Sequence, residues 1–125
     1  MTERQFTRTV DDYCAAWNAP DEAQRRALLQ PVWAEGAVYT DPTVHAAGLL
    51  QLLAHISGVA ARRPGAVLTR TSAVDAHHSV ARFTWQVAQG DGAVLREGID
   101  LVEFAADGQL VRVVGFFGPP PPVQG

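Results

Sequence analysis

A chain of 125 residues has room for one domain with a core and a pocket. Its composition, with 47% hydrophobic and 18% charged residues, is that of a globular rather than a disordered protein. The net charge is −3 and the ten basic residues, all arginine, are scattered, which argues against nucleic acid or an anionic membrane as a partner. A single cysteine excludes an internal disulfide, and the absence of a signal peptide and of an apolar run near ~20 residues predicts a cytoplasmic protein without a membrane span.

Apolar residues at helical spacing predict a first helix from about Thr2 to Asn18. Tyr13 is the polar group on this apolar stripe. Its hydroxyl either finds a backbone partner in the core or faces a site, and the pattern leaves both open. A second helix is expected to begin near Pro20, which suits a first helical turn, and to end before Pro31.

The stretch from Trp33 to Pro42 predicts a helix end, a turn and a short strand that ends at Asp41. Pro42 lacks an N–H and biases Asp41 away from the helical region, so the carboxylate is held on a rigid turn. Tyr39, two residues earlier, projects to the same face. Asp41 is therefore either a turn acid that binds nearby backbone N–H groups or a positioned functional acid.

A loop over 43–48 and a mostly apolar, buried third helix from Leu49 to about Arg62 are expected next. His55 in this helix is interpreted as a structural or solvent-edge histidine. The period then changes to that of strands, which are predicted over 66–74, 79–88, 94–104 and 110–118. Helices followed by an antiparallel meander predict an α+β domain over residues 1–118, with a proline-rich tail over 119–125.

Two of the predicted strands carry polar groups whose orientation matters. Asp100 shares a face with Val102 and Phe104, where a carboxylate is costly unless it is paired, neutral or lining a cavity. On the strand over 79–88, His78 and Arg82 share a polar face. Arg82 is a solvated side chain if that face is convex and a pocket arginine if it is concave.

No recognisable metal or cofactor motif is present. His77 and His78 are adjacent and should point apart on a strand, and no cysteine pair or His-x-x-x-His spacing accompanies them. A glycine-rich phosphate loop and a Gly-x-Ser-x-Gly elbow are also missing. We therefore expect neither a metal nor a cofactor.

Three motifs resemble the nuclear-transport-factor-2-like superfamily, which includes ketosteroid isomerases and SnoaL-like polyketide cyclases. They are DDYCAAWNAPD (11–21), WAEGAVYTDP (33–42) and EGIDLVEFAADGQLVRVVGFFG (97–118). The resemblance covers about residues 5–118. It implies a cone-shaped α+β barrel, in which about three helices pack inside a strongly curved antiparallel sheet around a deep apolar pocket, and a homodimer that pairs through the outer face of the sheet.

The resemblance to ketosteroid isomerases assigns roles to three residues. Asp41 matches the general base, Tyr13 matches the helix-one tyrosine and Asp100 matches the neutral acid that assists it. That enzyme is the standard example of a neutral acid beside a tyrosine. A short loop that carries His45, a possible extra acid or base, and the polar His78 and Arg82 favour a substrate smaller or more polar than a steroid. Candidates for the pocket wall or the core are Trp17, Trp33, Tyr39, Phe83, Trp85, Phe104 and Phe116.

Three functions remain open. The first is an isomerase or cyclase that abstracts a proton next to a carbonyl in a small apolar ligand, which predicts a raised pKa for Asp41. The second is a module that binds such a ligand or a protein without chemistry. The third is a limonene-type epoxide hydrolase built from Asp41, Arg82 and Asp100, which fails if Arg82 is directed to solvent.

Overall fold

The computed structural model describes residues 1–124. Thr2 is the N-cap residue of helix α1 (Glu3–Asn18). The Thr2 side chain accepts from the Gln5 N–H, and the Gln5 side chain accepts from the Thr2 N–H. This capping box satisfies two N–H groups that a helix start otherwise leaves unpaired. The apolar stripe of α1 is buried, as its spacing predicts.

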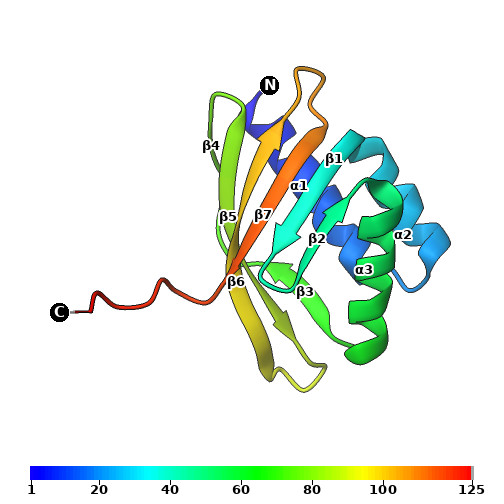
Figure 1. Cartoon of the computed structure of the whole chain (residues 1–125), viewed down its shortest axis with the longest axis vertical. Coiled ribbons are helices and arrows are strands. Elements are labelled where there is room, and N and C mark those ends of the chain that lie inside the picture. The colour runs from blue at the N-terminus through cyan, green and yellow to red at the C-terminus, as the bar shows by residue number, and fades with distance from the viewer. Residues whose placement is uncertain (125) are drawn as a thin grey trace.

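Two further helices follow the predicted order. Helix α2 (Glu22–Leu29) begins after Asp21, whose carboxylate accepts from the Gln24 N–H, and the short 3-10 helix η1 (Gln30–Val32) contains Pro31. Helix α3 (Leu49–Arg62) buries Leu52, Leu53 and Ile56. Figure 1 shows all three helices on one side of a curved sheet.

Seven strands form this sheet in the order β2-β1-β7-β6-β5-β3, with β4 also paired to β5. The strands are β1 (Trp33–Asp41), β2 (Val44–Ala47), β3 (Val67–Arg70), β4 (Asp75–His77), β5 (Val80–Ala88), β6 (Val94–Phe104) and β7 (Leu110–Phe117). The α+β class and the helix-lined curved sheet are confirmed. The sheet is not closed into a barrel, because β2 and β3 remain at its two ends.

Three details of the predicted sheet are wrong. The sheet is mixed rather than antiparallel, because β1 runs parallel to β7. The stretch 43–48 is mostly strand β2, since the Pro42-Thr43 turn folds it back onto β1. Of the strand predicted over 66–74, only β3 (Val67–Arg70) forms, because the Ser72 hydroxyl replaces a backbone acceptor and takes the Thr84 N–H. The short strand β4 (Asp75–His77), which was not predicted, follows on the same edge of β5.

The core fills the space between the helices and the sheet. Trp33 stacks on Tyr13 with ring centroids 6.3 Å apart, and Phe6 meets Phe104 edge-on at 4.7 Å. Gly36 has a positive φ of 75°, which accommodates the register shift between Trp33 and Val38 in β1. The large aromatic side chains at the start of β1 and the end of β6 therefore hold α1 against the sheet.

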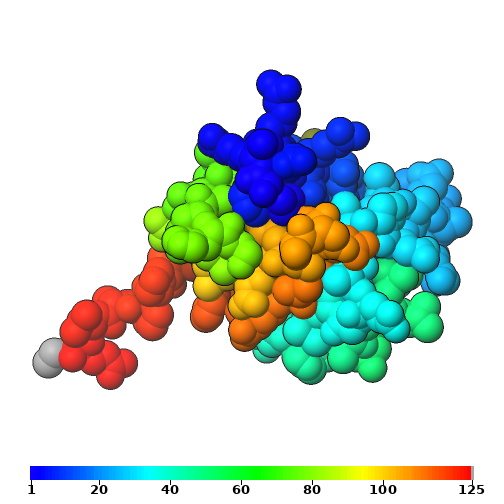
Figure 2. Space-filling model, turned by 90° about the horizontal axis from the view of Figure 1, so that it is seen from above, coloured from blue at the N-terminus to red at the C-terminus, as the bar shows by residue number. Residues whose placement is uncertain are grey.

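The described tail, residues 119–124, projects away from the body of the molecule (Figures 1 and 2). Gly125, the last residue of the predicted tail, lies outside the described residues. Among the helices that the structure describes, none is long and apolar enough to cross a membrane.

Asn18 fastens the end of α1 to the edge strand β3. Its amide donates to the Leu68 carbonyl and accepts from the Leu68 N–H, both at 2.8 Å. We expect Asn18→Ala to lower the free energy of unfolding by about 1–2 kcal/mol, since two hydrogen bonds are lost. Urea denaturation measures this. Gln109→Ala, which removes one bond to the Pro31 carbonyl, is the matched control and should cost less; equal losses would contradict the assignment.

Candidate active site

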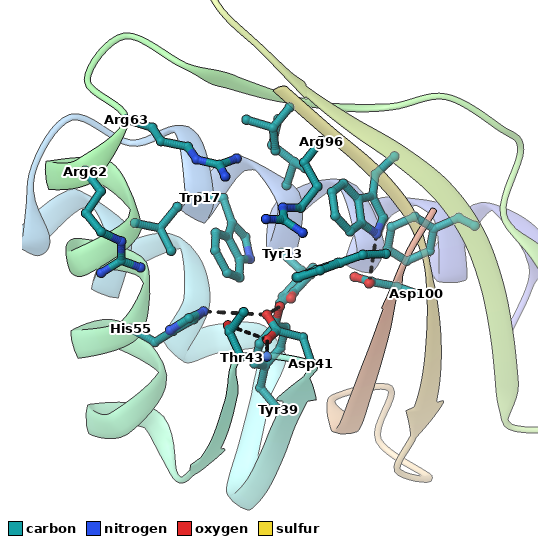
Figure 3. A pocket seen from close by; sticks show the side chains of 16 residues that line it. Tyr13, Trp17, Tyr39, Asp41, Thr43, His55, Arg62, Arg63, Arg96 and Asp100 are labelled. Atoms are coloured by element: carbon teal, nitrogen blue, oxygen red, sulfur yellow. Dashed lines mark hydrogen bonds and ion pairs between the residues drawn. The ribbon is translucent and has the colours of Figure 1, made fainter. Parts of the chain in front are cut away.

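A cavity of about 230 Å³ lies between the helices and the sheet. Side chains from α1, α3 and five strands line it, and Figure 3 shows the labelled ones converging on it. Its apolar wall consists of Trp17, Val59, Leu68, Phe83, Trp85, Val87 and Phe117. The cavity is smaller than the 300–1,000 Å³ usual for sites of drug-sized ligands, so it fits a small molecule.

Asp41 is held at the end of β1 by its neighbours. The Tyr39 hydroxyl donates to Oδ2 at 2.6 Å, and the Thr43 N–H and hydroxyl both donate to Oδ1 at 2.7 Å. Burial by itself raises the pKa of Asp41, but the hydrogen bonds from Tyr39 and Thr43 outweigh it and the net pKa is lowered. Asp41 is therefore ionised at neutral pH. The raised pKa expected of it is wrong.

His55 joins this group from α3. Its Nε2 lies 3.7 Å from Asp41 Oδ2, and its ring lies 5.7 Å from that of Tyr39. Burial lowers the pKa of His55; the Asp41 carboxylate opposes this effect, Arg62 adds to it, and the net pKa lies below the usual value. The imidazole is therefore mostly neutral at pH 7 and is available to accept or pass on a proton.

Asp100 faces the same cavity from the middle of β6 and is 6% exposed. Its Oδ1 accepts from the Trp85 indole N–H at 2.9 Å. Burial raises the pKa of Asp100 to about 7, with the Trp85 hydrogen bond opposing and the Asp41 charge adding to the rise. The two carboxyl groups of the cavity thus differ in protonation: Asp41 is ionised while Asp100 holds its proton over much of the range below pH 7.

Gly115 brings these two carboxyl groups together. It pairs with Asp100 across the β6–β7 ladder, and its neighbour Val114 pairs with Thr40, next to Asp41. A Cβ at this position would lie 2.9 Å from Asp100 Oδ1 and 3.5 Å from Asp41 Cβ. Because glycine has no side chain there, strand β7 separates the two acids without filling the space between their carboxyl groups.

Tyr13 and Trp17 present polar atoms to the cavity from α1. In residues 1–124 the buried Trp17 Nε1 makes no hydrogen bond of good geometry, but it lies close enough to the Tyr13 hydroxyl to lower the pKa of Tyr13. Burial, followed by the Asp100 charge, raises the pKa of Tyr13 well above its usual value, so the hydroxyl stays protonated. The Tyr13 hydroxyl therefore keeps a proton that it can donate to a bound molecule.

Three arginines line the other end of the cavity: Arg62 and Arg63 from the end of α3, and Arg96 from β6. The Arg96 guanidinium lies 4.0 Å from the centroid of the Phe117 ring. Sequence reasoning missed these arginines, Thr43 and His55. Of these residues, only Arg96 could have been placed in the cavity from the sequence, because it lies an even number of residues from Asp100 and so shares its face of β6.

Six residues predicted to bind substrate lie elsewhere. Trp33 and Phe104 are core residues, packed on Tyr13 and Phe6. His45 is exposed and bonds to Thr40 at 2.8 Å. The other three, also outside the cavity, are His78, Arg82 and Phe116.

The physical reason is that the polar face of β5 is convex. Arg82 is exposed and bonds to Asp75 at 2.8 Å across the β4–β5 ladder. His78 follows β4 in a turn with φ 53°, where its Nδ1 lies 3.1 Å from that of His77, so the two rings do not point apart. Phe116 is 53% exposed on the outer face, whereas Phe117 reaches the cavity.

The arrangement needed for an epoxide hydrolase is therefore absent. Arg82 is directed away from Asp41 and Asp100, and within residues 1–124 no arginine forms an ion pair with either acid. In the same described residues, no group of three His, Cys, Asp or Glu side chains is placed to hold a metal ion.

The family model for the SnoaL-like domain matches residues 10–113. The chain belongs to this family, within the nuclear-transport-factor-2-like superfamily. A "putative isomerase of the SnoaL-like family" from Agrobacterium tumefaciens is 31% identical, with a TM-score of 0.87 over 93% of this chain and 99% of the other. A search of curated proteins finds no match.

More distant structures share the fold. An NTF2-like protein of unknown function from Exiguobacterium is 18% identical, with a TM-score of 0.72 over 90% of this chain and 99% of the other. A "putative SnoaL-like polyketide cyclase" from Jannaschia is 17% identical, with a TM-score of 0.74 over 91% and 85%. The recognition of the superfamily from its three motifs is confirmed.

The raised pKa of Asp100 predicts how stability changes with pH. The pKa of Asp100 is about 7 in the folded chain and 3.8 in the unfolded chain. The contribution of protonated Asp100 to stability is therefore lost as the pH rises from 3.8 to about 7. Asp100→Asn is neutral throughout. Its stability relative to the native chain should rise by about 2–3 kcal/mol from pH 5 to pH 8, measured by urea denaturation. A constant difference would contradict the raised pKa.

Proposed function

We propose that the chain is a small-molecule enzyme of the ketosteroid isomerase or SnoaL-like cyclase type, which abstracts a proton next to a carbonyl. One observation carries the proposal. An ionised Asp41, a buried Asp100 with a pKa of about 7 and the protonated Tyr13 hydroxyl all face one mostly apolar cavity. Such a separation of two carboxyl pKa values is how a site holds a base and an acid side by side.

In the proposed reaction, Asp41 takes the α-proton, the electron pair of that C–H bond forms the C=C bond of the enolate, and the π pair of the carbonyl moves to its oxygen. A carboxylate has about four acceptor positions, and Tyr39 and Thr43 occupy three, which leaves one on Oδ2 for the proton. Tyr13 and protonated Asp100 donate to the enolate oxygen. Asp41 then returns the proton to another carbon of the dienolate. In a cyclisation, the enolate carbon instead forms a C–C bond to a second carbonyl, and the proton held by Asp41 goes to the alkoxide oxygen that this attack creates.

The lowered pKa of Asp41 has two consequences for this chemistry. It keeps the carboxylate ionised, but it also makes Asp41 a weaker base, so the enolate needs strong stabilisation. A neutral Asp100 and Tyr13 supply that stabilisation from a mostly apolar wall of the cavity. The polar surroundings of Asp41 and the buried surroundings of Asp100 thus have complementary roles.

A spectroscopic assay with a β,γ-unsaturated ketone tests the proposal, because conjugation of the product changes the absorbance. Asp41→Asn should lower kcat/KM by at least about 10³-fold, since it removes the base. The rate of the native enzyme should fall as the pH rises through about 7, because ionised Asp100 no longer donates. In Asp100→Asn this fall should disappear. Native activity that persists in Asp41→Asn would contradict the assigned base.

A non-catalytic binding module is the second candidate. The three hydrogen bonds that Asp41 already accepts favour it, because a satisfied carboxylate is also what a structural acid needs. In that case the cavity would bind small carbonyl compounds with equal affinity in the native chain and in Asp41→Asn, and neither would turn them over.

We also propose that a second copy of the chain covers the outer face of the sheet. Phe116 and Leu101 are 53% and 44% exposed there, beside the ion pairs Asp75–Arg82 and Glu103–Arg112. Apolar side chains flanked by both signs of charge can match a symmetric copy of themselves.

Phe116→Asp should shift the native dimer to monomer in size-exclusion chromatography with light scattering, because it buries a charge in the proposed interface. Leu50→Asp, at an exposed apolar residue on α3, is the matched control and should leave the mass unchanged. A native chain that is monomeric at about 100 μM, well above the dissociation constant of a stable dimer, would refute this interface.

A further inference from the structure

The end of the cavity opposite Asp41 is formed by arginines that have no acidic partner. Arg62, Arg63 and Arg96 line the cavity, yet none of them makes an ion pair or a side-chain hydrogen bond with another residue in the described part of the chain. Three other arginines do have an acidic partner, namely Arg70 with Asp11 at 2.8 Å, Arg82 with Asp75 at 2.8 Å and Arg112 with Glu103 at 3.5 Å, whereas Arg4 and Arg8, unpaired within residues 1–124, are exposed on α1 and line no part of this cavity.

Structural roles explain why an arginine occupies each of these three positions, but they do not explain why the guanidinium groups point into the same cavity. Arg62 and Arg63 lie in and just after the last turn of α3, where positive charge suits the helix dipole. The Arg96 guanidinium is attracted to the Phe117 ring. Neither effect requires the charged groups to meet, yet Figure 3 shows the guanidinium groups of Arg63 and Arg96 facing each other across the cavity. Like charges in a partly enclosed space are costly without an anion between them.

The local charge also contrasts with that of the whole chain. The net charge of the protein is −3, but the cavity wall holds three arginines against two carboxyl groups, of which Asp100 is protonated over much of the range below pH 7. The cavity therefore carries at least one excess positive charge. An excess of this kind in an acidic protein attracts and orients an anionic ligand.

The two charged ends are separated along one strand. Asp100 and Arg96 lie on the same face of β6, four residues apart, which corresponds to about 13 Å between their Cα atoms. Trp85 and Phe117, which also line the cavity, pair with Gly98, midway between Arg96 and Asp100 on β6. A ligand that spans the cavity thus meets hydrogen-bond donors and a base at one end, an apolar wall in the middle and guanidinium groups at the other.

We propose that the arginine end binds a carboxylate, so that the substrate is a small oxo acid with its ketone at the Asp41 end. The planar guanidinium groups of Arg63 and Arg96 match the two oxygens of a carboxylate. The identity of the carbonyl group rests on the proposed function; recognition of the carboxylate does not. A cavity of about 230 Å³ admits a short-chain oxo acid of this kind.

Binding of two oxo acids, levulinate and 6-oxoheptanoate, and of their methyl esters tests the charge recognition, with titration calorimetry as the readout. We expect at least one acid to bind at least about tenfold more tightly than its ester, and this preference to weaken as salt is added. This comparison uses the unaltered chain, so it does not depend on any variant folding. Equal affinity of acids and esters, or no binding of either acid, would overturn the proposal.

Two double variants test whether Arg63 and Arg96 are the residues that recognise the carboxylate. Arg63→Gln/Arg96→Gln should remove the preference for the acid, whereas Arg4→Gln/Arg8→Gln makes the same change in charge at exposed positions of α1 and should preserve it. Thermal melts check that both variants fold. If both double variants lose the preference equally, the recognition is a property of the net charge and the arginine site is refuted.

Exchange of the α-protons of the oxo acids in D₂O, followed by proton NMR, tests the proposed function separately. If the acid binds through the arginines and exchange depends on Asp41, both proposals hold. If charge-dependent binding persists without exchange, the carboxylate site stands and the proposed catalysis fails on these ligands. If exchange occurs equally in acid and ester, the proposed catalysis stands and the carboxylate site fails.

Discussion

The absence of a side chain at Gly115 is the constraint on which the site depends. Strand β7 runs between the strands that carry Asp41 and Asp100, and any Cβ at this position would come within 2.9 Å of Asp100 Oδ1. Two carboxyl groups can approach across a strand only where that strand has no side chain to fill the gap. Glycine is needed here for space, and its conformational freedom is not involved, because φ is not in the left-handed region.

The two carboxyl groups differ because their surroundings differ. Asp41 lies at a strand end, where the Thr43 N–H and hydroxyl and the Tyr39 hydroxyl stabilise its charge. Asp100 lies in the middle of a central strand, where burial dominates and, among residues 1–124, the Trp85 N–H is the one donor to it. Hydrogen bonding favours the charged form of the first acid and desolvation favours the neutral form of the second. An ionised and a neutral carboxyl group therefore coexist in one cavity.

The two ends of the same cavity differ in chemical character. Its acids, His55 and Tyr13 gather at one end, aromatic and aliphatic side chains form the middle, and arginines from α3 and β6 close the other end. A small molecule that is apolar along its whole length would leave these guanidinium groups without an anionic partner. This difference between the ends links the proposed carbonyl chemistry to the proposed carboxylate recognition, since one short oxo acid can place its ketone at the Asp41 end and its carboxylate at the arginine end.

The sequence by itself determined the superfamily, the types of most elements and the placement of Tyr13, Asp41 and Asp100 on a helix, at a strand end and in mid-strand, because helical spacing, an acid before proline and a mid-strand carboxylate are local features. Only the tertiary structure decided which face of each strand is concave. Alternation divides the residues of a strand into two sets without saying which set faces the helices, so Phe116 and Arg82 were assigned to the cavity, which Phe117 and Arg96 line instead. His55 and Thr43 join Asp41 through the packing of α3 and the β1–β2 hairpin, contacts that no local pattern encodes.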